Sequence, residues 1–154
     1  MSVLAATARP DSWNLPLLLH VGGAMILVAG VVASACALAV AGGDGRLLRL
    51  GYRALLLVGL PGYVLMRVGA EWIADKEGYN AKGAPTPTWL GIGFIVADAG
   101  ALLLIIALVV GGIGLSRMRK GRGGEGLLKT PLVISLVLLV AYTVAVWAMA
   151  GKPS

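Results

Sequence analysis

Asp98 is the residue whose presence most needs a chemical explanation. It lies nine residues after Trp89 and nineteen before Arg117, in a stretch that is otherwise apolar. A helix would carry it about 13 Å beyond Trp89, and its side chain is too short to reach back over that distance. An unpaired carboxylate at such a depth would cost about 3 kcal/mol on a membrane-insertion scale. We therefore expect Asp98 to be protonated, paired or in contact with water.

Arg67 is the partner that the spacing indicates for Asp98. It lies five residues before Trp72, which is about 7.5 Å along a helix. Glu71 follows Arg67 at i+4, so the two share a helix face and can form an ion pair. Tyr63 continues the same face one turn earlier.

His20 completes this set of polar residues. It lies seven residues after Trp13, about 10 Å along a helix. His20, Tyr63, Arg67, Glu71 and Asp98 would then come from three helices and meet in one half of a bundle. We interpret them as a buried ligand- or proton-binding cluster in which Asp98 titrates and Arg67 tunes its pKa. The alternative is that they satisfy one another as structural contacts between helices.

His20 is also compatible with a second chemistry. It is the only histidine in the chain, and its ring could be an axial ligand to haem b held between helices. The iron would stay five-coordinate or take a methionine such as Met25, Met66 or Met149. The protein would then be a haem-binding redox protein rather than one that handles a solute.

The composition identifies the environment of these residues as a membrane. Of 154 residues, 58% are hydrophobic and 13% charged, whereas a soluble domain has roughly 25% charged residues. Four apolar stretches are each long enough to span a bilayer: 15–41, 47–74, 89–115 and 131–150. We predict one all-α domain over 1–154, a four-helix transmembrane bundle. No soluble catalytic domain fits beside it, and no P-loop, HExxH or cysteine pair is present, which favours a protein that is not an enzyme.

Basic residues predict the orientation of the bundle. Seven Lys and Arg residues flank the spans on one side and four on the other. The seven are Arg46, Arg49, Arg117, Arg119, Lys120, Arg122 and Lys129; the four are Arg9, Lys76, Lys82 and Lys152. Both termini are therefore expected on the extracytoplasmic side of a bacterial plasma membrane. The net charge of +6 then reflects topology in the lipid bilayer and not binding to nucleic acid.

Small residues at helical spacing predict where the helices touch. Ala29, Ala33, Ala37 and Ala41 form one stripe, and Gly93, Ala97 and Ala101 form another. Such stripes let helices approach closely in lipid. Packing within the bundle is one use of them, and contact with a second copy or another membrane protein is the other.

The segment Leu17-Leu18-Leu19-His20-Val21-Gly22-Gly23-Ala24 resembles the first helix of several small bacterial membrane families. These are small four-span integral membrane proteins, the membrane domain of the copper-resistance D type, and the four-helix haem-containing protoporphyrinogen oxidase. Resemblance to the oxidase implies haem at His20. Resemblance to the copper-resistance type implies copper uptake.

Overall fold

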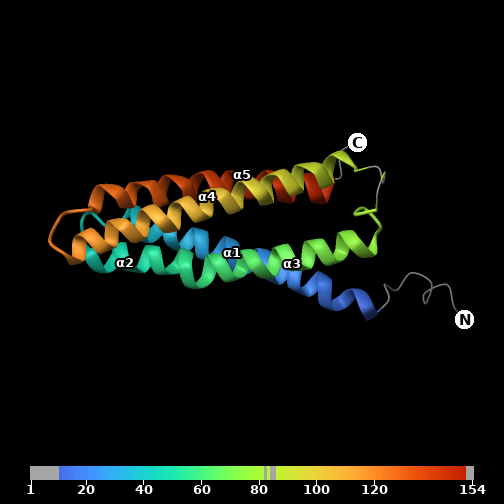
Figure 1. Cartoon of the computed structure of the whole chain (residues 1–154), viewed down its shortest axis with the longest axis horizontal. Helices are drawn as coiled ribbons and strands as arrows, with labels where there is room; N and C mark the ends of the chain where they lie inside the picture. The colour runs from blue at the N-terminus through green and yellow to red at the C-terminus, as the bar shows by residue number, and fades with distance from the viewer. Residues whose placement is uncertain (1–10, 82, 84–85, 152–154) are drawn as a thin grey trace, which may run out of the picture.

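The structure, a computed structural model, describes residues 11–81, 83 and 86–151, and these form a bundle of long helices (Figure 1). Four helical spans are long and apolar enough to cross a membrane: Asn14–Ala39, Gly45–Lys76, Thr88–Arg119 and Glu125–Gly151. The predicted all-α, four-span fold is confirmed. Arg9, Lys82 and Lys152, which entered the predicted orientation, lie outside the described residues.

Several of the spans are built from more than one element. A 3-10 turn, η1 (Asp11–Trp13), precedes α1 (Asn14–Ala39). The second span joins α2 (Gly45–Ala54), the π-helical turn η2 (Leu55–Gly59) and α3 (Leu60–Lys76). The third is α4 (Thr88–Arg119), and the fourth joins the 3-10 turn η3 (Glu125–Leu128) to α5 (Lys129–Gly151). The third span ends at Arg119, four residues past its predicted end at 115. Its last turn carries basic residues, which suit a helix C-terminus.

Pro61 explains the π-helical turn in the second span. Proline has no N–H, so it cannot bond to the carbonyl of Leu57, and its ring crowds that carbonyl. In η2 the Leu60 N–H bonds instead to the carbonyl of Leu55, five residues earlier. This wider turn keeps the span continuous across the proline.

Glycines let α1 and the second span touch along their backbones. A Cβ added to Gly23 would lie 2.8 Å from the Cα of Met66, and one added to Gly69 would lie 2.8 Å from the Cα of His20. Gly30 lies seven residues after Gly23, and Gly62 lies seven residues before Gly69. A Cβ added at either position would meet the facing backbone equally closely. Because no side chain separates the backbones, His20 is held directly against α3.

The residues of the predicted alanine stripe of the first span differ in burial. Ala37 and Ala41 are buried, but Ala29 and Ala33 are exposed. The glycine face allows a closer approach than an alanine face does, so it forms the contact with the second span. In α4, Gly93 and Ala97 of the predicted stripe are buried, whereas Ala101 is partly exposed.

The helices are arranged as two antiparallel pairs. α1 packs along α3, and α4 packs along α5. α1 also contacts α5 closely, whereas α3 and α4 make few backbone contacts with each other. The apolar core lies between the pairs and includes Leu27, Val31, Leu55, Leu104, Leu138 and Tyr142.

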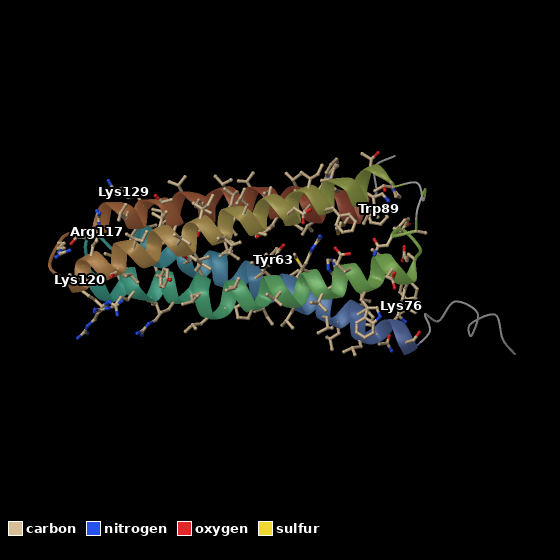
Figure 2. The ribbon with its side chains drawn as sticks, in the orientation of Figure 1. Tyr63, Lys76, Trp89, Arg117, Lys120 and Lys129 are labelled. Atoms are coloured by element: carbon tan, nitrogen blue, oxygen red, sulfur yellow. The ribbon has the colours of Figure 1, made fainter. Side chains whose placement is uncertain are left out.

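The two ends of the bundle differ in chemistry. Arg117, Lys120 and Lys129 lie at one end, while Trp89 and Lys76 lie at the other (Figure 2). Trp13, Trp72 and Trp147 belong to the same end as Trp89, because they lie at the start of α1 and near the ends of α3 and α5. We refer to these as the basic end and the tryptophan end.

Candidate functional site

Arg67 joins two carboxylates from different helices. Its Nη2 lies 2.8 Å from Oε1 of Glu71, one turn further along α3, and 3.1 Å from Oδ1 of Asp98 on α4. The prediction that Arg67 pairs with both groups is thus confirmed. We call Arg67, Glu71 and Asp98 the triad.

α4 presents two side chains to Arg67. Phe94 and Asp98 are four residues apart and share a helix face. The Cζ atom of Arg67 lies 5.1 Å from the centre of the Phe94 ring, within the range of a cation–π contact. Arg67 is therefore held by a charge and an aromatic face together. Both contacts cross from α3 to α4, two helices that make few backbone contacts with each other.

The triad is only partly buried, in contrast to the buried cluster expected from the sequence. The side chain of Arg67 is 27% exposed, that of Glu71 45% and that of Asp98 65%. Asp98 lies between the exposed residues Ile95 and Leu102 on the outer side of α4. The depth of Asp98 follows from the sequence, but its direction around the helix does not.

One donor of Arg67 is left over. Its Nη1 is buried and has no hydrogen-bond partner among the described residues. A buried guanidinium nitrogen without an acceptor is uncommon in folded proteins. An acceptor such as water or a bound solute would complete this site.

His20 and Tyr63 lie beside the triad rather than within it. Nδ1 of His20 lies 3.1 Å from the carbonyl oxygen of Met66, the residue before Arg67. Because a carbonyl only accepts, Nδ1 carries the hydrogen of this bond. Tyr63 packs against the apolar core and lies one turn before Arg67 on α3. Three predicted site residues therefore form direct ion pairs, and two are their neighbours.

Tyr142 is a polar residue near the site that the sequence did not single out. It is 7% exposed, and its hydroxyl has no partner within the described part of the chain. The hydroxyl lies over Gly100, where an added Cβ would be 3.1 Å away. A tyrosine in an apolar span has no charge that would single it out in the sequence. Only the structure shows that its hydroxyl is buried against Gly100.

The charges of the triad define what it can bind. Two carboxylates and one guanidinium carry a net charge of −1 when all are ionised, so the site favours one proton or one small cation. No group of three or more His, Cys, Asp and Glu residues placed to hold a metal ion occurs in residues 11–81, 83 and 86–151.

Comparisons with protein-family models, with curated proteins and with solved structures found no match.

Proposed function

We propose that this protein handles a proton or a small cation at the triad, within a bacterial plasma membrane and without catalysing a chemical reaction. The observation that carries the proposal is the position of Asp98. Its carboxylate is paired with Arg67, yet its side chain is 65% exposed, on a span that is apolar enough to cross a membrane. Ionisable groups at such depths are costly and typically serve ion or proton pathways.

The shared guanidinium indicates Asp98 as the group that changes charge. If Asp98 takes up a proton, Arg67 keeps its 2.8 Å ion pair with Glu71, and the triad becomes neutral. Glu71 is less suited to this role because it adjoins Trp72, close to the end of α3. Asp98 therefore cycles between a charged state bound to Arg67 and a neutral or cation-bound state.

The two ends of the bundle support an orientation with the triad toward the outside. Arg117, Lys120 and Lys129 gather at one end (Figure 2), and short cytoplasmic loops are enriched in such residues. With the basic end in the cytoplasm, both termini and the tryptophan end face outward. The triad then lies in the outer half of the membrane, within reach of extracytoplasmic protons.

Proton flux into liposomes tests the proposal. The protein is reconstituted with a pH-sensitive dye inside the vesicles, and an inward proton gradient is applied. We expect Asp98→Asn to lower the flux at least about tenfold, because the variant lacks the group that exchanges the proton. Vesicles that hold a sodium-sensitive dye instead, under a sodium gradient at equal pH, show whether the carried species is a cation.

Asp75→Asn is the matched control for this assay. Asp75 is an exposed aspartate at the end of α3, outside the triad, and its variant is expected to keep the wild-type flux. Proton and sodium fluxes that are unchanged in a folded Asp98→Asn protein would overturn the proposed function.

A second candidate function, haem binding, is favoured by the hydrogen bond of His20. Nδ1 faces the Met66 carbonyl at 3.1 Å, which leaves Nε2 of the neutral ring with its lone pair. Metal-bound histidines commonly donate their other ring N–H to a carbonyl in this way. The resemblance of segment 17–24 to the first helix of the four-helix haem-containing oxidase also supports this alternative.

An absorption spectrum decides this alternative. Protein expressed with added haem is purified and recorded before and after reduction with dithionite. A haem protein would show a Soret band that is lost in a folded His20→Ala variant, and a colourless wild-type protein would exclude His20 as a haem ligand.

A further inference from the structure

The end of α4 brings three basic side chains into one small region. Gly121 has a φ of 65°, and the Arg122 N–H bonds back to the Arg117 carbonyl at 3.0 Å. The Gly121 N–H bonds to the Met118 carbonyl at 3.1 Å. These two bonds are those of a Schellman motif, which requires a left-handed residue after the helix. The motif folds the chain back, so that Arg122 returns beside the last turn of the helix.

A hollow lies where the chain folds back. Its volume is about 470 Å³, and it is lined by Ile113, Ser116, Arg117, Lys120 and Arg122. Three of these five residues are basic, and none of the three forms an ion pair among the described residues. Cations gathered in this way repel one another, and the partial negative charge of the helix end offsets this in part. The hollow is suited to an anion.

An apolar stripe leads from the hollow along the outside of α4. Ile113 lines the hollow and is exposed, and Val109, one turn further from the basic end, is also exposed. Ile105 continues the stripe by another turn. This sequence of apolar side chains followed by cations matches an acyl chain followed by an anionic headgroup.

We propose that the hollow at the basic end binds the phosphate of an anionic phospholipid, with an acyl chain lying along Ile113, Val109 and Ile105. The site is distinct from the triad, whose residues lie in the halves of α3 and α4 nearer the tryptophan end. Arg117 and Lys120 lie at the basic end (Figure 2). A soluble phosphate would use the cations but not the apolar stripe. Basic pockets at the cytoplasmic ends of spans are suited to such headgroups.

Native mass spectrometry of the full-length protein tests the site. The protein in detergent is titrated with phosphatidylglycerol or phosphatidylcholine that carry the same acyl chains. We expect tighter binding of phosphatidylglycerol, and a loss of this preference by at least about tenfold in R117Q/K120Q/R122Q, since each cation near an anionic headgroup contributes about fivefold. R122Q alone should lose about fivefold, and it leaves every helical residue in place.

The matched control removes three other cations from the same end. R46Q/R49Q/R53Q changes the net charge equally, but these exposed residues lie on α2 and do not line the hollow. Its preference for phosphatidylglycerol should match that of the wild type. Equal losses in both triple variants, or no preference in the wild type, would overturn the proposal. Displacement of the lipid by millimolar inorganic phosphate would also overturn it, because the ligand would then be a soluble anion.

Discussion

Replacing Gly23 with alanine is expected to destabilise the protein by about 2 kcal/mol, the range of overpacked sites. The added Cβ would meet the backbone of α3, 2.8 Å from the Cα of Met66 and from the carbonyl carbon of Leu65. Backbone atoms cannot rotate away as a side chain can, so α1 and α3 must separate. Their separation would also lengthen the bond between His20 and the Met66 carbonyl.

Gly22 provides the control for this variant. It is the neighbouring residue on the same helix, and a Cβ added there meets nothing within 4 Å. Gly22→Ala should be neutral or should stabilise by up to about 1 kcal/mol, because alanine favours helix over glycine. Thermal unfolding of both variants in detergent, followed by tryptophan fluorescence, compares them directly. Equal melting temperatures would show that the backbones of α1 and α3 are not in contact.

Arg67→Leu should have the largest effect among single changes in the triad. It leaves two carboxylates, Glu71 and Asp98, without their shared partner, and unpaired charges in a membrane protein are costly. We expect a loss of about 3 kcal/mol. Asp98→Leu should cost less, about 1 kcal/mol, because Arg67 keeps Glu71.

The double variant Arg67→Leu/Asp98→Leu separates pairing from other effects of substitution. It removes both the cation and the deeper carboxylate, so it should be more stable than Arg67→Leu alone. A thermal unfolding series of the two single variants and the double variant measures this coupling. If Asp98→Leu were as harmful as Arg67→Leu, the guanidinium would not be shared with Glu71 as the structure shows.

The four spans and the partners of Arg67 could both be predicted from positions along the chain. The spans follow from length and hydropathy, and the ion pairs follow from depth and from the i, i+4 spacing of Arg67 and Glu71. These properties depend on position along a helix, which the sequence specifies directly.

Properties that depend on direction around a helix were predicted less well. The first span carries small residues on two faces, and only the structure shows that Gly23 and Gly30 rather than Ala29 and Ala33 meet the second span. The outward direction of Asp98 is hidden for the same reason. The cation–π contact of Phe94 and the buried hydroxyl of Tyr142 arise from packing between helices that are distant in sequence.

Infrared difference spectroscopy tests most directly whether Asp98 takes up a proton. The reconstituted protein is acidified stepwise, and the carbonyl stretch of protonated carboxyl groups is compared between the wild type and variants. Subtracting the variant spectra removes the signal of the carboxylates in water, such as Asp75. We expect Asp98→Asn to lack one component of this band and Glu71→Gln to retain it. A band that is unchanged in Asp98→Asn but reduced in Glu71→Gln would contradict the assignment of Asp98 as the group that exchanges the proton.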